Sequence, residues 1–210
     1  ELLVMTPHPI LIDNILHNAI DTAMSYTAFY NMTSALVADN NTSGPVKSEE
    51  RIQATKLNLQ RLTRLNKTTQ LLPEWSNLDI TKTSNLQWVV ITEAWCGDGS
   101  QLVPVINKVA EKLEISFKVV LRDSHPDLID RYLFRGTRSI PRLICFNAET
   151  GEELGNWGPR PAEAQQLVDD SIAKGIPHDD WVINLQNWYN QNKTVSLQNE
   201  LFSFVNDCLS

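Results

Sequence analysis

The sequence is poor in cysteine, in long apolar runs and in positive charge, and each shortage excludes a class of protein. Three cysteines among 210 residues are an odd number and too few for a disulfide-stapled secreted domain. No apolar run approaches the roughly 18 residues that cross a bilayer. A net charge of −7 leaves no basic surface for nucleic-acid phosphates or for anionic lipids. We therefore expect neither a nucleic acid nor a membrane as a partner.

Targeting signals and metal motifs are also missing. The chain starts at Glu1 without the basic region and apolar stretch of a secretory signal, although the missing initiator Met leaves open that a segment was removed. The four histidines show no metal-ligand spacing, and no glycine-rich phosphate loop occurs. We therefore expect no metal and no cofactor, and we place the protein in a reducing cytoplasm.

The residues that are abundant are those that build a core, because 42% of the chain is hydrophobic and six residues are tryptophan. Residues 1–84 read as helices, since apolar residues recur there at three- and four-residue spacing. Ile12 and Leu16 mark one apolar face, and Leu59 and Leu62 mark another. We expect these faces to be buried against the following domain or against each other.

From residue 85 the pattern changes to short runs of β-formers that alternate with helical segments, in the order β-α-β-α-β-β-α. The predicted strands are Leu86–Thr92, Ile115–Leu121, Arg142–Asn147 and Glu153–Trp157. Predicted helices begin after Cys96, at Pro126 (ending near Gly136) and at Pro161. The sequence therefore predicts an α/β domain over residues 85–174. A helical extension precedes it over 1–84, and helices packed on the core follow it over 175–210.

Cys96 is the candidate reactive thiol. It follows a predicted strand and opens a predicted helix, where free backbone N–H groups and the helix dipole favour thiolate over thiol. Trp95 precedes it, and Gly97 follows it without a side chain. We expect Cys96 to be partly exposed and to react fastest of the three cysteines. Its pKa should lie below the unperturbed ~8.5 if the helix terminus outweighs the charge of Asp98.

A second signal stands about 45 residues later, where Ser139, Ile140 and Pro141 come just before an apolar strand. Proline cannot donate to a central ladder, so Pro141 marks a strand start or a cis peptide bond. The Glu149-Thr-Gly151 turn then predicts a hairpin, and Gly158 follows its second strand.

These motifs together resemble thioredoxin, in that family's order and at nearly its spacing, over about 90 of the 210 residues. More narrowly, Trp95–Asp98 and Gly158–Pro161 resemble bacterial thioredoxin-like proteins that carry a single-cysteine Trp-Cys-Gly-Asp motif and helical extensions. The resemblance implies a thioredoxin-like fold, with a four-stranded mixed sheet and flanking helices. It also implies a cis Ile140–Pro141 bond.

The resemblance further implies a set of substrate-binding residues beside the catalytic candidates Cys96 and Asp98. This set comprises Trp95, Gly97, Ser139, Ile140, Pro141, Trp157 and Gly158. For Trp157, packing in the core is an equal alternative. Asp98 is either a helix cap or a proton acceptor beside the thiol. Glu93 is a further candidate acid or base, with an exposed structural role as its alternative.

The departures from thioredoxin limit the activity that can be carried over. The family's resolving cysteine lies three residues after the first, where this chain has Gly99. The buried Asp that helps thioredoxin move protons corresponds to Val90. Cys145 should lie roughly 13 Å along the strand from Pro141 and fill the core. Reduction by a cysteine pair therefore cannot run within this motif.

Three functions remain. The first is a monothiol thiol-disulfide oxidoreductase, in which Cys96 reacts with a protein disulfide or a low-molecular-weight thiol and an external thiol releases it. The second is a redox-silent thioredoxin-fold module that binds a peptide or protein. The third is a scaffold whose helical extensions cover the groove or form a dimer. The sequence gives no oligomeric state.

Overall fold

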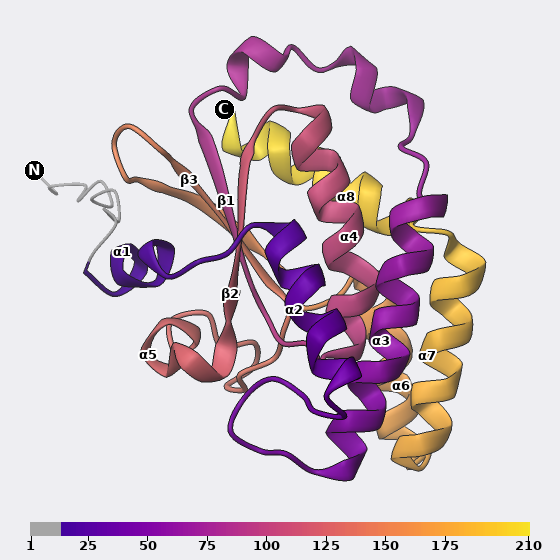
Figure 1. Ribbon diagram of the computed structural model, residues 1–210. Coiled ribbons are helices and arrows are strands. Elements are labelled where there is room, and N and C mark those ends of the chain that lie inside the picture. Colours follow the sequence, from indigo (N-terminus) through magenta and orange to yellow (C-terminus); the bar gives the residue numbers. More distant parts are fainter. Residues whose placement is uncertain (1–13) are drawn as a thin grey trace, which may run out of the picture.

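The computed structural model describes residues 14–210, which place a four-stranded sheet between two layers of helices (Figure 1). The strands are β1 (Leu86–Thr92), β2 (Ser116–Leu121), β3 (Arg142–Asn147) and β4 (Glu153–Trp157). The α-helices are α1 (Asn14–Asp21), α2 (Tyr26–Ala38), α3 (Glu49–Thr68), α4 (Gly97–Lys112), α5 (Pro126–Ile129), α6 (Ala162–Ala173), α7 (His178–Asn192) and α8 (Val195–Cys208). Short 3₁₀ turns are η1 (Pro73–Asn77), η2 (Ile80–Lys82) and η3 (Arg122–Ser124). The thioredoxin-like fold with helical extensions is confirmed.

The sheet has the strand order β2-β1-β3-β4 and is mixed. Strand β1 runs parallel to β2 and antiparallel to β3, and β3 runs antiparallel to β4. Successive side chains of a strand point to opposite faces, so β1 serves two cores at once. Trp88 and Val90 belong to one core cluster, Val89 and Ile91 to the other, and each is 0% exposed.

The two faces of the sheet are covered unequally. The larger core lies under α2, α3, α4 and α8, which gather on one side in Figure 1. The smaller core lies under α1 and α5 on the other side, where Leu16, Leu128 and Ile129 are buried. Because α4 begins directly after β1, the start of this helix is fixed at one end of the larger core.

The N-terminal extension is joined to the sheet by backbone and side chains. Between α1 and α2, Met24 pairs with Val119 of β2 through two hydrogen bonds of 2.9 and 2.8 Å, which covers part of the sheet edge. Leu16 and Leu62 are 4% and 1% exposed, and Leu59 is half-buried. Ile12, predicted to share the first apolar face, lies outside the described residues.

The helix predicted from Pro126 to Gly136 is much shorter in the structure, because α5 ends at Ile129. Phe134 and Thr137 pair through two backbone hydrogen bonds of 2.9 and 3.0 Å around Arg135 and Gly136. Both intervening residues have positive φ, which a right-handed helix cannot accommodate.

Within residues 14–210, no helix is long and apolar enough to cross a membrane.

Candidate functional site

Cys96 occupies the N-cap of α4, directly after the turn that leaves β1. Its Sγ accepts a hydrogen bond from the Gly99 N–H at 3.2 Å, as capping side chains do. The thiol donates to the carbonyl of Ile140 at 3.4 Å. The peptide bond between Ile140 and Pro141 is cis. The fold thus brings the two sequence signals, about 45 residues apart, into direct contact.

The thiol is buried rather than partly exposed, with 6% of Cys96 accessible. Burial raises its pKa to about 12, and the charge of Asp98 acts in the same direction. The Gly99 N–H, the Arg160 guanidinium and the Thr92 hydroxyl act in the opposite direction and favour the thiolate. The expectation of a lowered pKa is therefore wrong, because desolvation outweighs the helix terminus.

Asp98 holds two partners from distant parts of the chain. Arg160 Nη2 lies 2.7 Å from Oδ2, and the Tyr189 hydroxyl donates to Oδ1 at 2.7 Å. Asp98 is 9% exposed, and burial raises the pKa of Tyr189 well above its usual value, so this phenol stays protonated. The cap position belongs to Cys96. Asp98 therefore ties α7 to the first turn of α4.

A cavity of about 650 Å³ opens onto Cys96. Of the residues predicted from sequence, it is lined by Trp95, Cys96, Gly97, Asp98, Ser139 and Ile140. Two of its walls come from α3 and α7, which the sequence assigned to the N- and C-terminal helical extensions. A volume of this order suits a small molecule or a short peptide segment.

Pro141, Trp157 and Gly158 are not among the residues that line this cavity. Gly158 packs on the far side of the proline loop with φ +118°, and a Cβ there would clash with the carbonyl oxygen of Pro141. The Trp157 indole donates to Glu200 of α8 at 2.8 Å and packs against the larger core. The structure thus brings Trp157 to α8 and not to Cys96.

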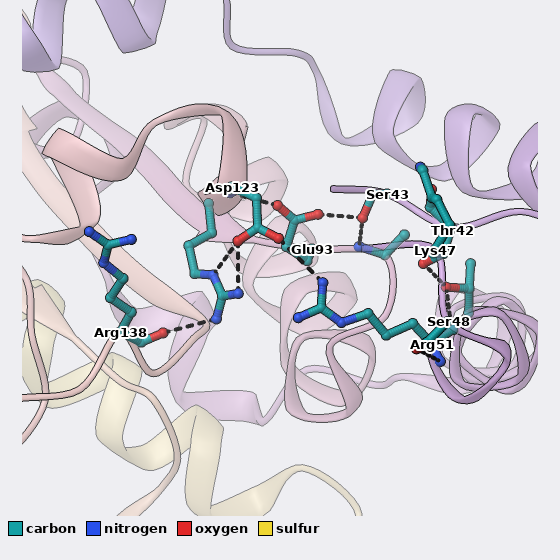
Figure 2. A network of polar contacts seen from close by, with 11 residues as sticks. Thr42, Ser43, Lys47, Ser48, Arg51, Glu93, Asp123 and Arg138 are labelled. Carbon is teal, nitrogen blue, oxygen red and sulfur yellow. Dashed lines mark hydrogen bonds and ion pairs between the residues drawn. The ribbon is translucent and has the colours of Figure 1, made fainter. Parts of the chain in front are cut away.

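The loop before Cys96 is held by residues of the N-terminal extension. Ser43 accepts a hydrogen bond from Ala94 N at 2.9 Å and donates to Glu93, as Figure 2 shows. Asn58 of α3 donates to the Ala94 carbonyl at 2.9 Å. Glu93 also accepts from Asp123 N at 2.8 Å and is 1% exposed. Burial raises the pKa of Glu93, which acts as a buried structural acid and not as an exposed one.

Trp95 is fixed by two arginines. The Cζ atoms of Arg51 and Arg122 lie 4.1 and 4.6 Å from the ring centroid, a cation–π geometry. Asp123 pairs with both guanidiniums, at 3.6 Å for Arg51 and 2.7 Å for Arg122. Figure 2 shows Arg51 and Asp123 in this network beside Glu93. Two paired arginines therefore hold the aromatic wall next to the thiol.

Gly99 stands where a second cysteine would be needed. A Cβ at this position would lie 3.3 Å from Cys96 Sγ, but it would clash with Thr92 Oγ1. Thr92 is fully buried at the end of β1. The space for a resolving side chain is thus filled by the threonine hydroxyl.

The other two thiols lie away from the cavity. Cys145 of β3 is 0% exposed and Cys208 of α8 is 8% exposed. Hydrogen bonding to Cys208, followed by burial, raises the pKa of Cys145. All three cysteines are free. Among residues 14–210, no three His, Cys, Asp or Glu side chains converge to hold a metal ion.

Comparison with known proteins places the chain in a family. The family model for thioredoxin matches residues 44–174, so this chain belongs to the thioredoxin family. A thioredoxin of Pyropia yezoensis is 41% identical over 56 residues, which are 26% of this chain and 50% of that protein. A thioredoxin of Porphyra purpurea is 39% identical over 62 residues, 29% of this chain and 53% of that protein. The chain therefore spans about half the length of the curated relatives it matches.

Two solved structures resemble the whole fold more weakly. An HIV epitope scaffold has a TM-score of 0.44 and 15% identity, covering 84% of this chain and 98% of its own. A protein of unknown function from Pseudomonas aeruginosa has a TM-score of 0.42 and 13% identity, covering 80% and 96%. Scores this low bear on neither site nor activity.

Proposed function

We propose that the protein is a monothiol thiol-disulfide oxidoreductase that acts through Cys96 with an external thiol. One observation carries the proposal: Cys96 Sγ lies at a cavity, accepts the Gly99 N–H and contacts the carbonyl before Pro141. A helix N-terminus next to a sulfur stabilises the thiolate once it forms. The family membership supports thiol chemistry at this place in the fold.

The reaction takes two exchanges. Cys96 loses its proton to solvent, and its thiolate attacks one sulfur of a disulfide R–S–S–R. A Cys96–S–S–R bond forms, and RS⁻ leaves and takes up a proton. A second, external thiolate then attacks the R-bearing sulfur and releases Cys96. The external thiol is the reductant, because Gly99 offers no sulfur within the chain.

The proposal also covers the cellular compartment in which the reaction takes place and a second class of substrate. A low-molecular-weight thiol must be plentiful, so a reducing compartment such as a bacterial cytoplasm suits the reaction. A protein disulfide is a second substrate class, provided that an exposed loop enters the cavity beside Ile140.

A second candidate function is a redox-silent module that binds a peptide or protein in the same cavity. The observation that favours it is the pKa of Cys96, raised to about 12 by burial, which leaves very little thiolate at neutral pH. In this case the thiol caps α4 and donates to Ile140 as a structural group.

The experiment that separates them measures exchange between bis(2-hydroxyethyl) disulfide and a monothiol, with mass spectrometry of the protein. We expect a mixed disulfide at Cys96 and turnover that falls about a hundredfold or more in Cys96→Ser. Cys208→Ser is the matched control and should stay within about twofold of the native chain. Equal turnover in Cys96→Ser, or no adduct at Cys96, would overturn the redox proposal in favour of the binding module.

A further inference from the structure

Arg61 lies beside the turn that carries Cys96 and Gly97, and it has no ion-pair partner among the described residues. It projects from α3 into the cavity wall, and its Nη1 lies 3.6 Å from where a Cβ on Gly97 would be. In the described part of the chain, its recorded hydrogen bond runs from Nη1 to Asn58 Oδ1 at 3.0 Å. The amide oxygen that it contacts is neutral, and Asp98 acts on Arg61 only through its charge, without an ion-pair contact.

The other arginines of the cavity differ from Arg61 in this respect. Arg122, Arg138 and Arg160 each have a carboxylate oxygen at 2.7 Å, from Asp123, Asp130 and Asp98. Among residues 14–210, no carboxylate lies within ion-pair distance of Arg61. Burial of this side chain lowers its pKa from the usual value, a sign that the charge is partly desolvated.

Carboxylates pair with three of the four arginines in the cavity lining, which leaves one arginine without an ion pair in an acidic chain. Four arginines line it against two carboxylates, Glu50 and Asp98, while the chain carries a net charge of −7. Glu50 lies eleven residues before Arg61 on α3, about 16 Å along the helix, too far to pair with it. Asp98 is already held by Arg160 and Tyr189. An anion entering the cavity therefore meets a guanidinium that has no ion-pair partner and lies beside Gly97, the residue after the thiol.

We infer that the substrate of Cys96 is a low-molecular-weight disulfide that carries a carboxylate, and that Arg61 binds this carboxylate. The inference rests on the proposed function and names its substrate class. A guanidinium pairs with a carboxylate through two parallel hydrogen bonds, which fix orientation as well as charge. Since Arg61 covers Gly97, a spacer of a few carbon atoms between carboxylate and sulfur places the disulfide over Cys96.

The apolar part of such a ligand also has a place to lie. Leu57 and Val182 line the rim from α3 and α7, 47% and 37% exposed, and Trp181 lies beside Val182. These side chains would cover a short hydrocarbon spacer while Arg61 holds its charged end. A cationic disulfide would be repelled by the same arginine.

The test uses three disulfides of similar size and different charge: 3,3′-dithiodipropionate, bis(2-hydroxyethyl) disulfide and cystamine. The rate of adduct formation at Cys96 of the native chain is measured by peptide mapping. Each rate is divided by that of the same disulfide with the chain unfolded in urea, which removes differences in intrinsic reactivity. We expect the anionic probe to be favoured about tenfold or more over the neutral one, and cystamine to be slowest.

Arg61→Gln should abolish this preference, and Arg61→Lys should retain part of it. Arg64→Gln is the matched control, because Arg64 lies one turn further on α3 and lines a neighbouring cavity. Its preference should match the native chain. Raising the salt from low to about 0.5 M should shrink the native preference.

The outcomes separate the two proposals. Adducts at equal normalised rates, or a preference unchanged in Arg61→Gln, would overturn the assignment of Arg61 and leave the monothiol reaction standing. Absence of an adduct with all three probes would overturn the monothiol reaction and this inference with it. Circular dichroism and thermal unfolding check that each variant is folded.

Discussion

The cysteines of this chain lie in two environments: Cys96 lies at the cavity, and Cys145 and Cys208 lie in the larger core. The two environments are similar in accessibility and differ in the groups that surround the sulfur. Cys96 and Cys208 are 6% and 8% exposed, and Cys145 is 0% exposed. Cys145 is the cross-strand partner of Trp88 on one side and of Gly155 on the other. A Cβ on Gly155 would lie 3.1 Å from Phe204 Cε2, so the missing side chain of Gly155 makes room for that ring, with Cys208 Sγ in ordinary contact distance at 3.7 Å. Cys96 instead meets a cavity, an N–H donor and an arginine.

The difference teaches that exposure alone does not identify a reactive thiol. In the core, hydrogen bonding to Cys208 and burial raise the pKa of Cys145, and the hydrogen bond from Trp88 opposes this rise without outweighing it. At the cavity, burial is opposed by the Gly99 N–H and Arg160, and a small molecule can reach the sulfur without unfolding the chain. Each experiment below breaks or sharpens this contrast.

The largest effect is expected in the pH dependence of alkylation. With its pKa raised to about 12, Cys96 should react with iodoacetamide about a hundredfold more slowly at pH 7 than in the urea-unfolded chain. The native rate should keep rising above about pH 9, where the unfolded chain reaches a plateau. The folded state keeps its proton there and the unfolded state loses it, so stability should also fall as pH rises from about 9 towards 12. A native plateau near pH 8 would contradict the raised pKa.

Replacing Asp98 with Asn should speed alkylation of Cys96 about tenfold at pH 8. The change removes a negative charge that raises the thiol pKa and leaves Arg160, which lowers it. Asp130→Asn is the matched control, because it breaks the exposed ion pair with Arg138 and should leave the rate unchanged. Stopped-flow or mass-spectrometric rates decide the matter, and an unchanged rate in Asp98→Asn would refute this account.

A cysteine in place of Gly99 should form a disulfide with Cys96 only when the side chain of Thr92 is made smaller. Gly99→Cys alone should lower the free energy of unfolding by about 3 kcal/mol, because its Cβ clashes with Thr92 Oγ1. The double variant Gly99→Cys with Thr92→Ala should recover stability and form a disulfide between Cys96 and the introduced cysteine, visible by mass after alkylation. If the single variant formed the disulfide at native stability, Thr92 would have no such role.

The smallest effect is expected on stability when serine replaces each thiol. Cys145→Ser should cost about 2 kcal/mol, since a hydroxyl is buried against Trp88 and other apolar side chains. Cys96→Ser should cost less than about 1 kcal/mol, because serine is a good N-cap. Urea unfolding of both variants measures the difference. Equal losses would show that the two environments do not differ for a polar group.

Much of the fold could be predicted from local pattern. Strands β1, β3 and β4 have the predicted bounds, and β2 differs by one residue at its start. The prediction rested on β-formers for β1 and on the hairpin turn for β4. Cys96 lies at the start of α4, because a strand, a turn and a helical period follow one another within a few residues. These features depend on residues that are close together in the chain, so a single sequence is enough to predict them.

The walls of the site could not be predicted, because they depend on which helix faces which. The spacing of apolar residues shows that α3 and α7 each have a buried face, but not that Arg61 and Tyr189 meet across one cavity. The Tyr189–Asp98 bond spans 91 residues. The burial of Cys96 escaped prediction for the same reason, since the helices that cover it lie outside the thioredoxin-like motifs.

The hydrogen bond between Tyr189 and Asp98 can form only late in synthesis, after α7 has been made. Tyr189 follows Asp98 by 91 residues, an interval of about 5 to 18 seconds at ribosomal rates. During that interval the chain passes from Asp98 to the end of β4 and can complete its sheet, while α7 does not yet exist. In that interval the cavity beside Cys96 lacks the wall that α7 provides. A small disulfide that exchanged with Cys96 at this stage would release one half as a thiol and leave the other half bonded to Cys96, where α7 would then enclose it.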